Sequence, residues 1–284
     1  MSISPQEPPA KSAEFENYTE TSKTYDGIRV PVGMKSLLGA CEVVAKNLNK
    51  NVHDLRLLDV GCGTGNYIMS LKDKVAHCTG LEFNAGMLEQ AKCKLAKVEN
   101  VVLSEGSALE LEAIEAGSFD IVIMTQVLHH LAPETNQIVF DGIFRVLKKG
   151  GAFWLQTCTP QQNMEGFWWA SIIPQGAAAN SSKYTGIPLL RSQLKRAHLE
   201  IRATDIPEEP LMPLEKYLDP NGPLTVFYRN GDSTWSLARK DELEAGLEWW
   251  QSKIDDGTTK SFIEERELER KRVGQSTCVW SLKN

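Results

Sequence analysis

The segment LLDVGCGTGN, residues 57–66, carries the strongest structural signal in this chain. It follows an apolar run that is expected to form a strand over 55–60, and it precedes a helix expected over 65–72. Its three glycines allow the backbone to turn sharply and to approach a ligand closely, because glycine tolerates positive φ angles. In open sheets of parallel strands, ligands bind beyond the carboxyl ends of the strands. The segment therefore predicts a ligand-binding loop between the first strand of a sheet and the following helix.

Around this loop, short apolar runs alternate with segments of helical spacing. The β-branched run at 119–125 is typical of a buried strand. Residues 133–151 have the spacing of an amphipathic helix, expected to end at Lys148, Lys149 and Gly150. This alternation predicts an α/β fold: a Rossmann-like, doubly wound sheet of seven mainly parallel strands, covered by helices on both faces. Strands are expected at 55–60, 75–82, 101–106, 119–125, 152–157, 201–206 and 276–282, and further helices at 34–48, 84–98, 188–198, 240–254 and 259–272.

The chain divides into four parts by composition and pattern. Residues 1–15 are rich in Pro, Ser and Glu and are expected to be a flexible tail. Residues 16–50 are expected to form an N-terminal helical lid, and 51–160 the ligand-binding core. Residues 161–284 are expected to form a cap inserted in the C-terminal half, with the last strands and helices of the same domain. Irregular loops are expected at 158–186 and 207–235.

Composition argues against several classes of protein. The net charge is −6, whereas proteins that bind nucleic acids usually carry a basic excess. Six cysteines are spread singly, with no C-x-x-C pair, which argues against a zinc cluster and for a reducing compartment. The sequence has no apolar run of about 18 residues that could cross a membrane, and residues 1–18 lack the apolar stretch of a secretory signal. We therefore expect a cytoplasmic protein with no metal site and no nucleic-acid or membrane partner.

The spacing of the glycines separates two classes of ligand. A dinucleotide-binding loop has the pattern G-x-G-x-x-G, and Asn66 stands where its third glycine would fall, which disfavours a nicotinamide dehydrogenase. From Asp59 the loop has instead Asp-x-Gly-x-Gly-x-Gly. This pattern resembles the class I S-adenosyl-L-methionine (SAM)-dependent methyltransferases, and the chain is similar to their ubiquinone-biosynthesis-like (methyltransferase type 11) group. The resemblance covers about residues 55–157. It implies that SAM is the cofactor and S-adenosyl-L-homocysteine the product.

The resemblance implies a set of cofactor contacts. Glu82 ends the second strand, where a carboxylate accepts hydrogen bonds from ribose hydroxyls. Phe83 and Met87 would pack against the adenine, although helix-core packing is an alternative for Met87. Ser107 stands where the family often has Asp, and the Ala108 backbone is a second candidate for the adenine edge. The expected cofactor-binding residues are Tyr18, Tyr25, Arg29, Asp59, Gly61, Gly63, Asn66, Glu82, Phe83, Met87, Ser107, Ala108 and Gln126.

Three of these residues precede the first helix, in the expected lid. Tyr18 or Tyr25 would cover the sulfonium or bond to the cofactor carboxylate, and Arg29 would pair with that carboxylate. An ordinary amphipathic cover is the alternative for this segment. Gln126, after the fourth strand, is expected to line the methionine part of the cofactor, mainly through its backbone.

The acceptor side is predicted from the residues after the fourth strand and from the cap. His129 is expected to face the acceptor and to act as a base, with His130 as the second candidate. Trp168, Trp169 and Tyr184 are expected to bind the substrate in a partly aromatic pocket. Packing within the cap is the alternative for each of them.

These observations predict an S-adenosylmethionine-dependent methyltransferase that acts on a small-molecule acceptor at O, N or S, by in-line displacement. The sequence after the fourth strand is TQVL and lacks the Pro-Pro motif of enzymes that methylate nucleic-acid amino groups. A protein or RNA methyltransferase and a SAM-binding protein without catalysis are the alternatives.

Overall fold

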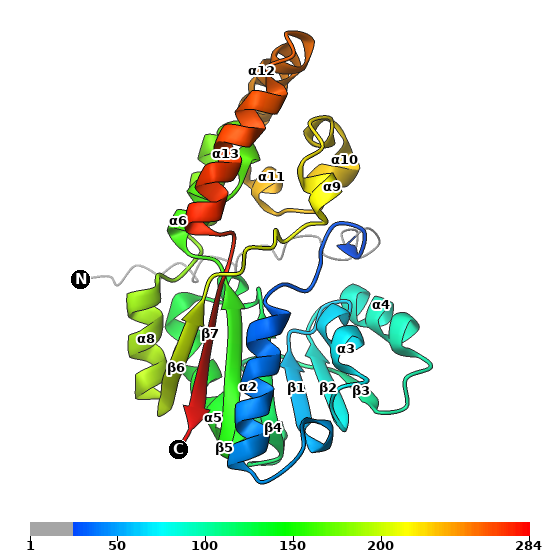
Figure 1. Cartoon of the computed structure of the whole chain (residues 1–284), viewed down its shortest axis with the longest axis vertical. Coiled ribbons are helices and arrows are strands. Elements are labelled where there is room, and N and C mark those ends of the chain that lie inside the picture. Colours follow the sequence, from blue (N-terminus) through cyan, green and yellow to red (C-terminus); the bar gives the residue numbers. More distant parts are fainter. Residues whose placement is uncertain (1–24) are drawn as a thin grey trace, which may run out of the picture.

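Seven strands form one sheet in the order β3-β2-β1-β4-β5-β7-β6 (Figure 1). The computed structural model describes residues 25–284, so Tyr18 and the expected tail 1–15 lie outside the described residues. Neighbours from β3 to β5 are parallel, and β7 is antiparallel to both β5 and β6. The predicted doubly wound, mainly parallel sheet is therefore confirmed. The strands are β1 (Arg56–Val60), β2 (His77–Glu82), β3 (Val101–Glu105), β4 (Phe119–Thr125), β5 (Leu147–Thr157), β6 (Leu199–Asp205) and β7 (Thr277–Lys283).

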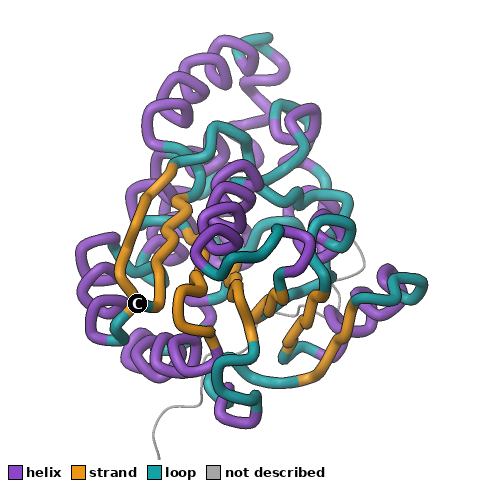
Figure 2. The backbone as a smooth tube through the Cα atoms, turned by 60° about the horizontal axis from the view of Figure 1, so that its bottom comes forward, coloured by secondary structure: helices purple, strands orange, loops and turns teal. Residues whose placement is uncertain are grey.

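Helices cover both faces of the sheet (Figure 2). On one face, Leu57 and Ile121 pack with buried side chains of the first helices. On the other, Leu58 and Val122 pack with buried side chains of residues 139–146 and 190–197. The alternation of adjacent strand residues between the two faces explains why β1 and β4 are apolar throughout. The helices next to the sheet are α2 (Met34–Asn47), α3 (Asn66–Leu71), α4 (Ala85–Leu95), α5 (Asn136–Val146) and α8 (Ile187–Arg196).

The cap lies beyond the carboxyl ends of the parallel strands, and α12 and α13 extend away from the sheet (Figure 1). Its core is a buried aromatic cluster that includes Trp168, Trp169, Tyr217 and Trp250. The cap helices are α6 (Pro160–Glu165), α7 (Pro174–Ser181), α9 (Leu214–Tyr217), α10 (Val226–Arg229), α11 (Thr234–Leu237), α12 (Lys240–Asp255) and α13 (Thr259–Val273). Short 3₁₀ turns are η1 (Val52–Asp54), η2 (Leu111–Ala113), η3 (Leu128–His130), η4 (Pro133–Thr135), η5 (Trp168–Ser171) and η6 (Gly222–Leu224).

Two sequence predictions about local structure are wrong. The stretches expected to be irregular contain the short helices α6, α7, α9, α10 and α11, which are too short to show helical periodicity. The helix expected over 133–151 ends at Val146, where β5 begins. Lys148 does not cap that helix, because its Nζ pairs with the fully buried Asp120 at 2.9 Å, beside the Nζ of Lys50.

Five of the six cysteines are buried and unpaired, and the sixth, Cys93, is exposed and unpaired. Among residues 25–284, no helix combines the length and apolar character needed to cross a membrane.

Candidate active site

A cavity of about 860 Å³ lies between the carboxyl ends of the strands and the cap. Pockets that hold small ligands measure about 300–1,000 Å³, so this one is large enough for a sizeable molecule. It lies where the strand order reverses between β1 and β4, which is the switch point predicted for ligand binding. The predicted residues that line it are Tyr25, Arg29, Gly61, Gly63, Asn66, Glu82, Phe83, Met87, Ser107, Ala108, Gln126, His129, His130 and Tyr184.

The glycine loop takes its shape from three left-handed residues. Gly61 has φ 75°, and a Cβ there would lie 2.4 Å from Val127 Cγ2. Gly65 has φ 79°, and a Cβ there would lie 2.8 Å from the Leu95 side chain. Gly63 has φ 55° with no atom within 4 Å of an added Cβ, so this position faces open space in the cavity wall. The loop therefore brings bare backbone to the cavity.

Glu82 connects the end of β2 to the glycine loop. One carboxylate oxygen accepts a hydrogen bond from the Gly63 backbone N–H at 2.8 Å, and the other accepts one from Asn84 N–H at 2.7 Å. Burial raises the pKa of this carboxyl, and the backbone N–H groups oppose that rise. A carboxylate offers about four lone-pair sites, so each oxygen retains capacity for a ligand hydroxyl. These residues fit the ribose of an adenosyl group.

The side chains beside Glu82 suit a flat ring. Phe83 lines the cavity although it is 57% exposed, and Met87, also in the wall, is 4% exposed. Flexible thioethers and aromatic faces pack well against planar rings. Ser107 and Ala108 follow β3 and lie in the same wall, and the Ser107 Oγ accepts a hydrogen bond from Leu109 N–H at 3.1 Å.

Asp59 is not part of the cavity wall, and the cofactor contact expected for it stays a prediction. Its side chain lies on the same face of β1 as Leu57, behind the loop, and it is 1% exposed. Within residues 25–284, neither carboxylate oxygen has a hydrogen-bond partner. Burial, followed by the neighbouring Glu82, raises the pKa of Asp59 to about 8.

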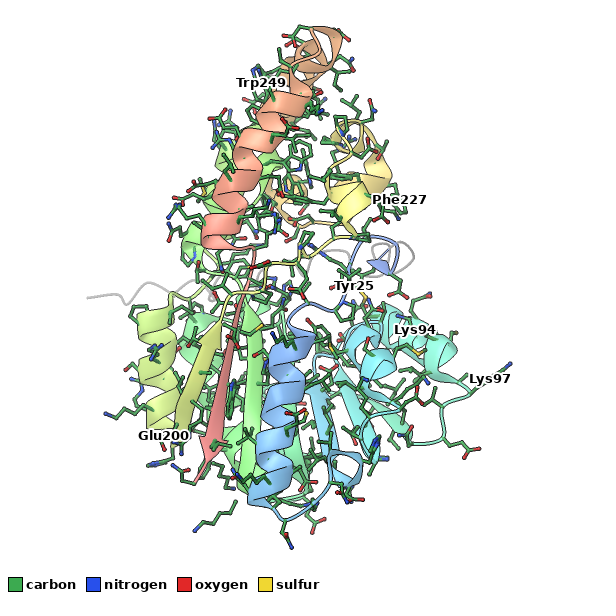
Figure 3. The ribbon with its side chains drawn as sticks, viewed as in Figure 1. Tyr25, Lys94, Lys97, Glu200, Phe227 and Trp249 are labelled. Atoms are coloured by element: carbon green, nitrogen blue, oxygen red, sulfur yellow. The ribbon has the colours of Figure 1, made fainter. Side chains whose placement is uncertain are left out.

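The start of the described chain closes over the loop. Asp26 accepts a hydrogen bond from the Thr64 hydroxyl at 2.5 Å and pairs with Lys94 Nζ at 2.6 Å. The same ammonium donates to Asn66 Oδ1 at 2.6 Å. Figure 3 shows Tyr25 where this segment passes between the sheet and the cap. Sequence reasoning missed Asp26, Thr64 and Lys94, because their pairing depends on residues far apart in the chain.

Arg29 joins the same segment to the cap. Its Nη2 lies 3.1 Å from Asp232 Oδ2, and both side chains are largely buried. Burial lowers the pKa of Arg29, but Asp232, Tyr25 and Tyr184 together raise it by more, so the guanidinium stays charged. Nη1 is buried and has no hydrogen-bond partner in the described part of the chain. The pairing of Arg29 with a cofactor carboxylate remains a prediction.

His129 lies in the cavity wall on the acceptor side. Its ring stacks on Tyr184 with centroids 4.4 Å apart, and His130 lies 3.9 Å away. Its pKa is well below the usual value, because burial and then the charges of His130, Lys183 and Arg29 disfavour protonation. Among the described residues, Nδ1 has no hydrogen-bond partner. The neutral imidazole is therefore the form present near neutral pH.

Gln126 supports this wall from the end of β4. It has φ 54°, a left-handed conformation that is uncommon for a residue other than glycine and often marks a functional site. Its Nε2 lies 3.3 Å from Cys158 Sγ at the end of β5. Burial is the main reason that the pKa of the Cys158 thiol rises to about 12, so the thiol is protonated.

Trp168 and Trp169, predicted to bind substrate, do not line the cavity. Both are 1% exposed and pack within the cap core. The indole N–H of Trp168 donates to the Tyr217 carbonyl at 2.7 Å. The 3₁₀ turn η5 carries both side chains into that core, while the preceding Phe167 reaches the cavity together with Trp235.

In residues 25–284, no group of three or more His, Cys, Asp or Glu side chains could hold a metal ion.

The core of the chain is similar in sequence to known methyltransferases. Residues 58–155 match the family model described as a methyltransferase domain. Over 102 residues the chain is 38% identical to a demethylmenaquinone methyltransferase of Lactococcus lactis, covering 34% of this chain and 39% of the relative. Over 100 residues it is 38% identical to a demethylmenaquinone methyltransferase of Staphylococcus aureus, covering 34% of this chain and 40% of the relative. The match thus spans about two fifths of the length of these relatives.

Solved structures share the fold. A protein of Anabaena variabilis, assigned as a methyltransferase from an antibiotic biosynthesis pathway, has a TM-score of 0.69 at 20% identity, covering 89% of this chain and 98% of that one. A SAM-dependent methyltransferase of Aquifex aeolicus has a TM-score of 0.51 at 15% identity, covering 68% of this chain and 93% of that one. Residues 58–155 are therefore similar to methyltransferase domains.

Proposed function

We propose that this protein transfers a methyl group from SAM to a small-molecule acceptor. The observation that carries the proposal is that one cavity joins the two halves of such a site. The glycine loop and Glu82 lie in its wall on the sheet side, and His129 and Tyr184 lie in its wall on the acceptor side. A donor and an acceptor that share one cavity can be held in reacting geometry, which supplies roughly 7–11 kcal/mol in favourable systems.

The residues of the wall suggest how the cofactor would be held. Glu82 would accept the ribose hydroxyls, and Phe83 with Met87 would contact the adenine. Gln126 and the lid residues Tyr25 and Arg29 would lie toward the methionine part. When bound, SAM supplies a methyl group on a positively charged sulfur, which is already an activated donor.

The cap and the lid contribute by excluding water. Asp26 ties the lid to Thr64 and Lys94, and Arg29 ties it to Asp232 of the cap. A dry site favours loss of the sulfonium charge during transfer to a neutral or anionic nucleophile. The enclosure that these contacts create supports methyl transfer in preference to binding alone.

His129 contributes a neutral imidazole that can accept a proton or a hydrogen bond. Its depressed pKa makes it a weak base. It would therefore assist a nucleophile that is already acidic or anionic, and it would assist a strongly basic amine poorly. We infer that His130 has a supporting role beside it.

The position of the cavity beneath the cap favours a small acceptor over a protein or an RNA. The net charge of −6 also disfavours a polyanionic partner. The demethylmenaquinone methyltransferases that the chain matches over 102 and 100 residues bear the name of a small-molecule acceptor. The unpaired cysteines are consistent with our proposal of a cytoplasmic location.

The test is transfer of tritium from methyl-labelled SAM into a cell extract that is then separated by molecular size. The proposal predicts label in the low-molecular-mass fraction with the wild-type protein and none with Glu82→Ala. Label in protein or RNA would support a macromolecular acceptor. Binding of SAM without any transfer would support a SAM-binding protein and overturn the proposal.

A further inference from the structure

The charged side chains in the cavity wall are unevenly placed. Among the described residues that line the cavity, they are Arg29, Glu82, Arg229 and Asp232. Glu82 lies at the sheet end, in the adenosyl part of the proposed site. The other three lie at the end formed by the lid and the cap.

At the cap end, the carboxylate already has partners. Asp232 accepts a hydrogen bond from Arg29 Nη2 at 3.1 Å and another from the Thr234 backbone N–H at 2.9 Å. Arg229 donates through Nη1 to the Pro223 carbonyl at 2.6 Å, and no carboxylate among residues 25–284 pairs with it. The wall at this end therefore carries a cationic excess.

This excess does not follow from the composition of the protein, because the chain as a whole carries a net charge of −6. Burial and His130 are the main causes of the low pKa of His129, and the cations Lys183 and Arg29 lower it further. The cap end of the cavity is thus electropositive within an acidic protein. A local field of this kind raises the concentration of ligands of opposite charge.

Flat apolar side chains lie in the same wall. Phe167 and Trp235 come from the cap, and Tyr184 stacks on His129. Trp235 and Phe167 are nearly buried in the protein, so they form a rigid apolar surface. An aromatic wall combined with guanidinium donors suits a flat molecule with an anionic group at one end.

We propose that the methyl acceptor is a small organic anion with a flat apolar body, whose negative group binds at Arg229 with Arg29 nearby. This inference rests on the proposed methyltransferase function and names its substrate class. An uncharged quinone, the kind of acceptor named for the demethylmenaquinone methyltransferases, would leave the Arg229 guanidinium without an anionic partner.

The test compares two probes of nearly equal size and shape, one an anion and the other neutral. The protein is first loaded with S-adenosylhomocysteine, and loading is verified by calorimetry. Binding of para-fluorophenylacetate and of its neutral amide, para-fluorophenylacetamide, is then measured by fluorine NMR. We expect the carboxylate to bind roughly tenfold more tightly than the amide, as one charge-assisted hydrogen-bonded contact would give.

Variants assign the preference to Arg229. Arg229→Gln should remove the advantage of the carboxylate, and Arg229→Lys should retain most of it. Arg239→Gln is the matched control, because Arg239 is an exposed cap residue, 68% accessible, whose partner is Asp241. It removes the same charge from the cap surface and should change neither affinity.

The outcomes separate this inference from the proposed function. If S-adenosylhomocysteine does not bind, the methyltransferase proposal fails. If it binds but the amide binds as tightly as the carboxylate, or Arg229→Gln leaves the preference intact, the anionic acceptor is wrong. Should Arg229→Gln fail to fold, salt dependence in the wild-type protein decides: added salt should weaken binding of the carboxylate and leave that of the amide unchanged.

Discussion

The Glu82 carboxylate accepts a hydrogen bond from the backbone N–H of Gly63 at 2.8 Å, although the two residues belong to different βα units. This contact fixes the loop after β1 against the end of β2, and both residues line the cavity. One side chain therefore shapes the loop and presents a carboxylate to the same space. Loop geometry and ligand recognition are coupled through it.

Replacing Glu82 should weaken cofactor binding strongly. Glu82→Gln removes the anionic acceptor and should lower SAM affinity by about ten- to a hundredfold, the equivalent of losing a hydrogen bond to a charged group. Calorimetric titration of SAM measures the change. Glu105→Gln is the matched control. Glu105 is the register neighbour of Glu82 on the adjacent strand β3, but it is exposed and lies outside the cavity wall. Equal losses in both variants would contradict the assignment.

Replacing Gly63 separates backbone strain from ligand exclusion. Gly63→Ala adds a methyl group at φ 55° in open space, and Gly117→Ala does the same at φ 64° in a loop away from the cavity. Both should cost about 1–2 kcal/mol of stability, the penalty of a left-handed conformation in an L-residue. Only Gly63→Ala should also abolish SAM binding, measured by calorimetry on the folded variants. Normal SAM binding by Gly63→Ala would show that the ligand does not approach this backbone.

The pH dependence of turnover should reflect the lowered pKa of His129. Because its pKa lies well below the usual value, the ring stays neutral near neutral pH and is protonated only in acid. The kcat should therefore be flat from about pH 6.5 upward and fall as the pH drops through the shifted pKa. His129→Ala should lower kcat by about a hundredfold or more if the ring takes a proton. His53→Ala, at an exposed position before β1, is the control. Normal turnover by His129→Ala would show that no base acts here.

Much of the fold was predictable because its signals are local. The strand run at 119–125 and the loop at 57–66 are encoded by β-branched residues and by glycines that take left-handed conformations. These features constrain the backbone wherever the rest of the chain lies. The position of Glu82 in the cavity wall follows from the same regularity, because parallel strands end at one edge of the sheet.

The cap was less predictable, because its side-chain directions depend on tertiary packing. Phe167, Trp168 and Trp169 are adjacent and chemically similar, yet only Phe167 lines the cavity. Likewise Arg29 and Asp232 form an ion pair across 203 residues of sequence. No local pattern encodes either outcome. Residues 148–151, Lys-Lys-Gly-Gly, were mispredicted for a different reason. Their composition is typical of a helix end, but in the structure they belong to β5.

The stability of the ligand-free protein should depend on the protonation of Asp59. Its pKa of about 8 in the folded state lies above the ordinary value of 3.8, so the folded protein binds this proton more tightly than the unfolded chain. The stability from this group is present below the ordinary pKa and is lost as the pH rises through about 8. Asp59→Asn should therefore gain stability relative to wild type with rising pH, by a few kcal/mol at about pH 8.5. Urea unfolding at about pH 5 and pH 8.5 measures this. The same difference at both pH values would contradict the assignment.

The most direct test of the central claim is a crystal structure of the protein grown with S-adenosylhomocysteine. We predict the adenosyl group in the cavity beside the loop at 61–65, with both ribose hydroxyls within hydrogen-bond distance of Glu82. An adenosyl group bound elsewhere, or ribose hydroxyls turned away from Glu82, would contradict it.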